Sequence, residues 1–512
     1  MERLALIDLG SNSVRFVISE IADNGSYRLI YQEKESIRLS EGMWETNYLT
    51  EAAMKRAINA LQVFSHMAEI MKTTHVYAVA TAAVRFSRNG KAFIKRVYEE
   101  TGITLTCISG EEEARLGFLG VINTIGLDNF VLFDLGGAST EVSLVENRQV
   151  VRSVSLPMGA LTLTGMFQHG TELTTKEYDI MIAHIQMLLE DESWLKQIGW
   201  PLVGIGGTAR NMAKIDQRSH EYPIAKLHNY ELKYSRIVEI LELVTSKSLA
   251  QRRKIPGLSQ ERADIIVAGA ALIQQLSKYV GAKSMYIGGS GLREGLFYDY
   301  YGKHYMNTSG VIDDILMHSA ENVLLSMPQN DLDHVKYTAN LADTIFEQWQ
   351  SLHGCNERIR KLLMVAALLH DMGKQINYYS HARHSAYMLV NSNLYGISHV
   401  EQAICAFIVM NSHGYTNKLY KTSEYAKLLG SGHKTIIAKM SLILSVAEAI
   451  DESHEQLAVS VSSVITDREV VLTVWTDKQV NALIAMAAID KLTKSFKKEF
   501  KKELLVEWKE RL

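Results

Sequence analysis

Two segments of the chain share a residue pattern that suits phosphate binding. LALIDLGSNSVRFVI starts at residue 4 and VLFDLGGASTEVSLV starts at residue 131; each runs from an apolar strand through Asp-Leu-Gly and small polar residues into a second strand. A turn rich in Gly and Ser lets backbone amides converge on a phosphate without an intervening side chain. We therefore predict two phosphate-binding turns that face each other across one phosphoanhydride.

Each of these segments also carries an aspartate, Asp8 in the first and Asp134 in the second. A carboxylate next to a phosphate would be repulsive unless a cation lay between them, and carboxylate oxygens are ligands that Mg²⁺ prefers. We expect Asp8 and Asp134 to hold Mg²⁺ or Mn²⁺, directly or through water. Glu141, which closes the second segment, could share that ion.

A run of three glutamates is the candidate source of a general base. SGEEEARLGFLGV places Glu111, Glu112 and Glu113 at the start of a predicted helix. One of these carboxylates could orient and deprotonate the water that attacks phosphorus, and the spacing alone does not choose among the three. Arg85, in ATAAVR after an apolar strand, could offset transition-state charge; Arg15 is a weaker candidate for the same role.

Composition and charge exclude several other classes of protein. No GxxxxGK[ST] motif occurs, so a P-loop nucleotide site is not expected. The net charge of −3 gives no general attraction for nucleic acid, whose only support is a lysine-rich tail from residue 491 to 511. Three scattered cysteines without a CxxC pair and apolar runs too short for a bilayer indicate a cytoplasmic protein without a membrane partner.

The order of strand-like and helix-like segments predicts the domains that position these residues. Residues 1–305 alternate short apolar strands with helical patterns, which is typical of an α/β fold. The two Asp-Leu-Gly segments lie 126 residues apart, so we predict a duplication, with one lobe in 1–125 and another in 126–305. Two further glycine turns, VGIGGTAR at 203–210 and MYIGGSGLR at 285–293, fall in the second lobe.

The C-terminal part of the chain has a different pattern of apolar and polar residues. Helical periodicity dominates 306–455, which we predict to be an all-helical domain, and 456–512 is predicted to be a small α+β domain with strands in 459–475 and a helical lysine-rich end. Within the helical region, four residues could bind a divalent metal: His334, His370, Asp371 and Asp451. His384 and His413 could contribute to a second metal site.

The motifs together resemble those of the exopolyphosphatase and guanosine pentaphosphate phosphatase family. IDLGSNS, ATAAVR, ISGEEEARLGFLGV, FDLGGASTE and GIGGTA occur in the family's order, and HARHSAY at 381–387 extends the resemblance into the helical region. The resemblance implies the duplicated, ribonuclease H-like fold of actin, with catalysis in the cleft between two lobes. It also implies that the helical region is an HD-type domain, named for a metal-binding His-Asp pair.

The same resemblance assigns roles to single residues. It implies that Glu113, the glutamate before Ala-Arg, is the catalytic base and that Arg85 contacts the substrate phosphate. It implies three phosphate loops: the first contains Asp8, Gly10, Asn12 and Ser13, the second contains Asp134, Gly136, Gly137, Ser139 and Glu141, and the third contains Gly207 and Thr208.

The predicted activity is removal of the terminal phosphate of inorganic polyphosphate. The nearest alternative substrate is guanosine pentaphosphate (pppGpp), which presents the same terminal phosphate; a kinase on the same fold and a non-catalytic sensor of polyphosphate or of pppGpp/ppGpp are further alternatives. The sequence does not separate these substrates or identify the metal. We expect the active form to be a homodimer.

Overall fold

The computed structural model describes residues 1–170, 172–327, 331–416 and 418–511. The chain divides into two compact units, Met1–Asp313 and Asp314–Leu512, which we call unit 1 and unit 2. The four predicted domains are a finer division than this, and their boundaries at 125, 305 and 455 remain predictions.

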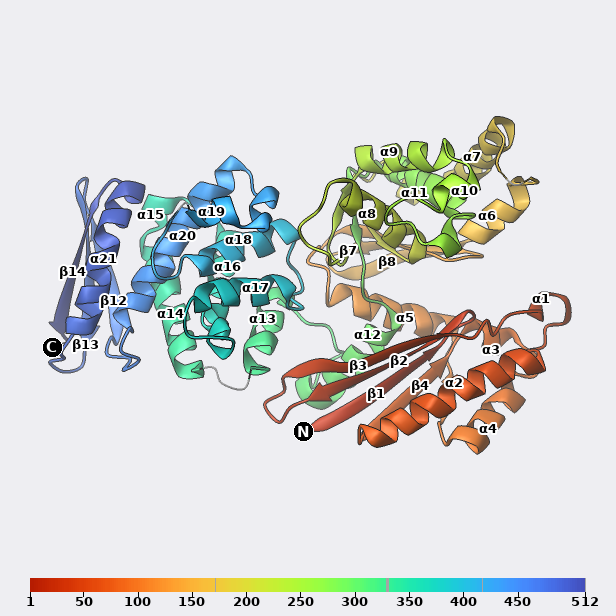
Figure 1. Ribbon diagram of the computed structural model, residues 1–512, viewed down its shortest axis with the longest axis horizontal. Coiled ribbons are helices and arrows are strands. Elements are labelled where there is room, and N and C mark those ends of the chain that lie inside the picture. Colours follow the sequence, from red (N-terminus) through yellow and green to blue (C-terminus); the bar gives the residue numbers. More distant parts are fainter. Residues whose placement is uncertain (171, 328–330, 417, 512) are drawn as a thin grey trace. The chain divides into compact units, whose positions relative to one another are not determined.

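Unit 1 begins with a five-stranded sheet in the order β3-β2-β1-β4-β5 (Figure 1). β1, β2 and β3 form an antiparallel meander, and β4 and β5 continue parallel to β1. The elements of this lobe I are β1 (Glu2–Leu9), β2 (Ser13–Ile21), β3 (Tyr27–Ser36), α1 (Met43–Thr46), α2 (Glu51–Ile70), β4 (His75–Ala80), α3 (Ala82–Phe86), α4 (Gly90–Thr101), β5 (Leu105–Cys107) and α5 (Gly110–Ile122).

The second sheet repeats this topology and adds one edge strand. β6, β7 and β8 form the meander, β9 and β11 continue parallel to β6, and β10 joins the edge. The elements of this lobe II are β6 (Phe130–Leu135), β7 (Thr140–Glu146), β8 (Gln149–Leu156), α6 (Ala160–Phe167), α7 (Thr175–Glu190), β9 (Leu202–Ile205), α8 (Gly207–Ser219), β10 (Glu231–Lys233), α9 (Tyr234–Thr245), α10 (Leu249–Arg252), α11 (Ile266–Val280), β11 (Ser284–Ile287) and α12 (Leu292–Tyr301). The predicted α/β duplication is thus present.

Helix α2 shows why the outer face of the first sheet is covered. The Thr50 hydroxyl accepts a hydrogen bond from the Ala53 amide and caps the helix start. Ala57, Leu61 and Phe64 then recur at helical spacing and are fully buried against Phe16 and other apolar residues of the strands. In Figure 1, α2 and α4 lie on the side of this sheet that faces away from lobe II.

Helices α5 and α12 lie between the two sheets and share one core with both (Figure 1). They approach closely at glycines: a Cβ added to Gly295 would lie 1.7 Å from the Leu116 carbonyl oxygen, and one added to Gly120 would lie 2.2 Å from the Gly291 carbonyl oxygen. No larger residue fits without a shift of the backbone. The N-terminal turn of α5, which carries the three glutamates, is therefore fixed between the lobes.

Unit 2 is mainly helical. Its elements are α13 (Ile315–Leu325), α14 (Leu332–Gln348), α15 (Gln350–His353), α16 (Glu357–Leu369), a 3₁₀ turn η4 (Met372–Gln375), α17 (His381–Asn391), α18 (His399–Met410), α19 (Lys418–Thr422), α20 (Ser431–Ile450), β12 (Ser460–Ile465), β13 (Glu469–Thr476), α21 (Leu483–Phe500) and β14 (Glu503–Glu510). Every residue of α20 from Met440 to Ile450 is buried, so this helix forms the centre of the unit.

The last strand corrects one prediction. The lysine-rich tail was expected to be helical to its end, but α21 stops at Phe500 and β14 pairs in parallel with β13. Leu504, Val506 and Trp508 are buried or half-buried whereas Leu505, Glu507 and Lys509 are exposed, a period of two that suits a strand. The C-terminal segment packs on the helices, since Trp349 is fully buried with its ring 5.2 Å from that of Phe496.

No helix within the described ranges combines the length and the apolar character needed to cross a membrane.

Candidate functional site

The two predicted phosphate turns have the same backbone geometry. In the β1–β2 hairpin, Gly10 donates its amide to the Ser13 carbonyl at 3.1 Å, and in the β6–β7 hairpin Gly136 donates to the Ser139 carbonyl at 3.0 Å. These two amides close the turns, so amides nearer each tip are the ones left to face a ligand. The residue opposite the aspartate on the second strand differs between the two hairpins: Asp8 pairs with Arg15, whereas Asp134 pairs with Glu141.

The aspartates of the two lobes belong to one site, because the same charged side chains act on both of them. Burial raises the pKa of Asp8 to about 6; Arg15 and Arg293 act against this shift, and Glu113 adds to it. The pKa of Asp134 is also raised to about 6, first by desolvation among the atoms around its carboxylate and then by Glu141, although the residue keeps some exposed surface. Glu113 adds to this shift and Arg15 opposes it. Since Glu113 and Arg15 act on both aspartates, these four groups form one charged cluster, which we call the interlobe site.

The structure separates the three glutamates of α5. Glu112 forms a bidentate pair with Arg115 at 2.8 Å through both oxygens, and Glu111 is exposed. Only Glu113 couples to both aspartates. Successive helical residues point about 100° apart, so one member of the run can face the interlobe site while its neighbours face elsewhere.

Arg85 holds the Glu113 carboxylate in place. Its Nη1 atom donates to the Ile108 carbonyl at 2.9 Å and to Glu113 Oε2 at 3.0 Å. The side chains of Arg85 and Glu113 are 23% and 35% exposed, so water can reach the pair. The structure therefore places the two predicted catalytic residues side by side, although they come from α3 and α5.

Two arginines of the interlobe site were missed by the sequence reasoning. Arg293 acts on Asp8, and Arg210 acts on Asp134. Arg210 also donates from Nε to the Gly206 carbonyl at 3.1 Å, which ties it to the start of α8. Both arginines end the glycine motifs VGIGGTAR and MYIGGSGLR, and that shared position is the signal that could have identified them.

The remaining predicted phosphate-binding residues divide by exposure. Asn12 is exposed, and Ser139 is half-buried and donates its hydroxyl to Glu141 Oε1 at 2.6 Å. Gly207 begins α8 and lies against the Arg262 guanidinium, where a Cβ would stand 2.0 Å from Cζ. Thr208 is only 1% exposed, with its side chain against Gly269, so only its backbone could take part in binding at this site.

Comparison with known proteins identifies the family. Residues 17–304 match the model of the Ppx/GppA phosphatase family, and residues 319–495 match the model of Ppx/GppA phosphatase domain III. The chain belongs to the Ppx/GppA phosphatase family. Members of this family are phosphatases, and Glu113 and Asp134 of the interlobe site lie within the matched residues.

Solved structures of Ppx/GppA proteins share the fold. A family member from Aquifex aeolicus is 27% identical with a TM-score of 0.54, and the match covers 59% of this chain and 99% of that one. An exopolyphosphatase from Cytophaga hutchinsonii is 25% identical with a TM-score of 0.53, covering 59% of this chain and 98% of that one. The recognition of the family from its motifs is thus confirmed.

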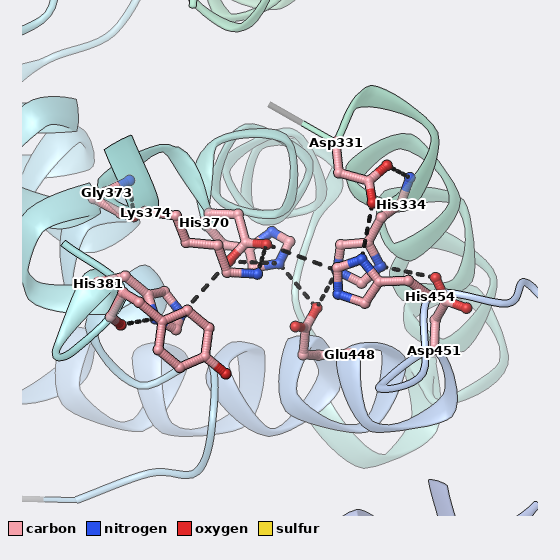
Figure 2. Close-up of polar contacts among 12 residues, drawn as sticks. Asp331, His334, His370, Gly373, Lys374, His381, Glu448, Asp451 and His454 are labelled. Atoms are coloured by element: carbon pink, nitrogen blue, oxygen red, sulfur yellow. Dashed lines mark hydrogen bonds and ion pairs between the residues drawn. The ribbon is translucent and has the colours of Figure 1, made fainter. Parts of the chain in front are cut away.

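Unit 2 of this Ppx/GppA protein contains a separate cluster of potential metal ligands (Figure 2). His334, His370, Asp371 and Glu448 are all buried, and one ligand atom from each lies within 4.8 Å of the others. Glu448 was not predicted. Burial opposes protonation of His334, but a hydrogen bond with Asp451 and the nearby Glu448 carboxylate outweigh it and raise its pKa to about 10.

The other predicted ligands of unit 2 lie around this cluster. Asp451 does not join the four converging groups; its Oδ2 atom lies 2.8 Å from His334 Nδ1, on the other side of the imidazole ring. His381 takes the place expected for His384, with Nε2 3.5 Å from Asp371 Oδ1. His413 lies beside it, since the Nε2 atoms of His381 and His413 are 2.9 Å apart.

Proposed function

We propose that the chain is an exopolyphosphatase that removes the terminal phosphate of inorganic polyphosphate as orthophosphate. The observation that carries this proposal is the position of Glu113, which is hydrogen-bonded to Arg85 and coupled to an aspartate from each lobe. The similarity to the exopolyphosphatase from Cytophaga hutchinsonii supports the choice of substrate.

The interlobe carboxylates suit a divalent cation. Asp8, Asp134 and Glu141 offer only oxygen ligands, which Mg²⁺ and Mn²⁺ accept. Desolvation is the main cause of the raised pKa of both aspartates, and a bound cation would offset its cost. When bound there, the ion would supply positive charge to the phosphate oxygens and so reduce the barrier to attack.

The chain's own residues account for the remaining steps. Amides at the tips of the two turns and the side chains of Arg15, Arg210 and Arg293 bind the terminal phosphates. Glu113 accepts a proton from a water molecule in line with the terminal phosphorus, and Arg85 keeps the carboxylate directed at that water. The new P–O bond replaces the bond from the terminal phosphorus to the bridging oxygen, so orthophosphate leaves and the polymer is one unit shorter.

The test is orthophosphate release measured in parallel on polyphosphate, guanosine pentaphosphate and ATP, each in excess with Mg²⁺. We expect multiple turnovers with the highest kcat/KM on polyphosphate, and loss of that activity in Glu113→Gln. Faster release from guanosine pentaphosphate would assign that substrate instead. Binding without product would indicate a sensor, and transfer from ATP to an acceptor would indicate a kinase.

A further inference from the structure

Four buried polar atoms of unit 2 point at one another without forming hydrogen bonds. They are His334 Nε2, His370 Nε2, Asp371 Oδ1 and Glu448 Oε2, and none has a hydrogen-bond partner among the described residues. The four residues are at most 5% exposed. Because buried polar atoms are normally hydrogen-bonded, four that meet at one point through ion-pair contacts alone require an explanation.

The distances among these groups match those around a shared ion. Glu448 Oε2 lies 3.2 Å from His334 Nε2 and 2.9 Å from His370 Nε2. Asp371 Oδ1 lies 3.8 Å from His370 Nε2, and Asp371 Oδ2 lies 3.9 Å from His334 Nε2. Ligands about 2.1 Å from one metal ion stand about 3.0 Å apart at right angles and about 4.2 Å apart when opposite. All four observed separations fall within or close to this range.

Outer contacts direct both imidazoles toward the same point. His334 Nδ1 lies 2.8 Å from Asp451 Oδ2, and His370 Nδ1 lies 2.6 Å from the Ala367 carbonyl oxygen. With each Nδ1 donating its hydrogen, the lone pair on each Nε2 is directed into the cluster. Such carboxylate–histidine and carbonyl–histidine pairs are typical outer contacts of metal-binding histidines. Figure 2 shows His334 between Asp451 and Glu448.

We propose that His334, His370, Asp371 and Glu448 bind one divalent first-row transition metal ion, with Asp451 as a positioning residue. Two imidazoles and two carboxylates favour Mn²⁺, Fe²⁺, Co²⁺ or Zn²⁺ over Mg²⁺, which prefers oxygen ligands alone. The chain then has two cation sites of different chemistry, one in each unit. This inference is independent of the proposed reaction in unit 1.

The rival arrangement is a network of protonated imidazoles paired with the carboxylates, which would show the same contacts without an ion. Metal content distinguishes the two. The full chain is stripped with EDTA, titrated with Co²⁺ in the presence of millimolar Mg²⁺ and followed by visible absorption, and bound metal is counted by mass spectrometry after gel filtration. We expect one equivalent of Co²⁺ that Mg²⁺ does not displace.

Variants test whether the single bound Co²⁺ ion occupies the cluster of His334, His370, Asp371 and Glu448. Glu448→Gln and His370→Ala are expected to weaken Co²⁺ binding at least tenfold, and Asp451→Asn about 10- to 100-fold, since it removes an outer contact but no ligand. His384→Ala, one helical turn from His381, is the matched control and keeps full binding, as does Glu141→Gln in unit 1. Wild-type protein that takes up no Co²⁺, or Glu448→Gln and Asp451→Asn proteins that bind it normally, would overturn the proposal. If Glu448→Gln does not fold, Asp451→Asn provides the test of Co²⁺ binding in its place.

Discussion

Arg15 and Glu141 occupy equivalent positions in the two duplicated hairpins, and they carry opposite charges. Arg15 faces Asp8 across the β1–β2 hairpin, and Glu141 faces Asp134 across the β6–β7 hairpin. The first pair is neutral in sum, whereas the second carries two negative charges. The duplication has therefore produced one turn suited to a phosphate and one suited to a cation, from nearly the same backbone.

The first prediction concerns the cation. Glu141→Gln removes one charge from the Asp134–Glu141 pair while it keeps an oxygen that Ser139 and Ser155 can still contact. We expect the Mg²⁺ concentration for half-maximal activity to rise about tenfold, equivalent to about 1.4 kcal/mol. The measurement is orthophosphate release against Mg²⁺ concentration at saturating polyphosphate. An unchanged Mg²⁺ requirement would remove Glu141 from the cation site.

The second prediction concerns the phosphate. Arg15→Gln keeps a polar side chain on β2 but removes the charge that acts on both Asp8 and Asp134. We expect KM for polyphosphate to rise about tenfold, because a charge-assisted contact contributes about 1.5–3 kcal/mol. Steady-state kinetics measure the change, with Arg28→Gln as a control on the next strand, where the arginine pairs with Glu20 at 2.8 Å. Equal KM values for the two variants would contradict this assignment.

The third prediction concerns Arg85. Arg85→Ala removes the hydrogen bond that fixes the Glu113 carboxylate, and we expect kcat to fall about 100-fold. Arg88→Ala, in the turn that follows α3, replaces an exposed arginine whose guanidinium lies over the Tyr48 ring, and should keep the wild-type rate. Rapid-quench or continuous phosphate assays compare the two variants. The idea fails if Arg85→Ala and Arg88→Ala turn over alike.

The duplication and the α/β class could be predicted from the sequence because their signals are local. Asp-Leu-Gly between apolar strands recurs, and each copy forms the same hairpin with the same amide contact at its glycine. Thr50 likewise marks the start of α2 through its own hydroxyl. In these cases the residues that carry the pattern also make the contacts that stabilise the structure.

The choice between neighbours on one helix could not be predicted in this way. Glu448 and Asp451 lie three residues apart on or just after α20, and His381 and His384 lie three residues apart on α17, so each pair shares a helix face. Which member reaches the cluster depends on how α14, α16 and α20 pack, and that is not a local property. For this reason, the residue at the cluster lies one helical turn from the predicted one in both cases: Glu448 instead of Asp451, and His381 instead of His384.

The fourth prediction concerns the helices that carry the site. In Gly295→Ala the new Cβ meets the Leu116 carbonyl, so α5 and α12 must separate, and we expect a loss of about 1–3 kcal/mol in unfolding free energy. Gly117→Ala is the matched control on α5, since its Cβ would meet no atom within 4 Å; alanine there should stabilise by up to about 1 kcal/mol. Urea unfolding together with hydrogen exchange of α5 and α12 measures both. Similar stabilities would show that the close approach is not required.

The most direct measurement is the turnover number of Glu113→Gln on polyphosphate at saturating Mg²⁺, compared with that of Glu112→Gln. Both variants change one carboxylate to an amide on the same helical turn, but Glu112 is paired with Arg115 outside the interlobe site. We predict that kcat falls by about 10²–10⁴ in Glu113→Gln, because the general base is lost, and changes little in Glu112→Gln. Near-normal turnover by Glu113→Gln, with the fold intact by circular dichroism, would contradict the mechanism.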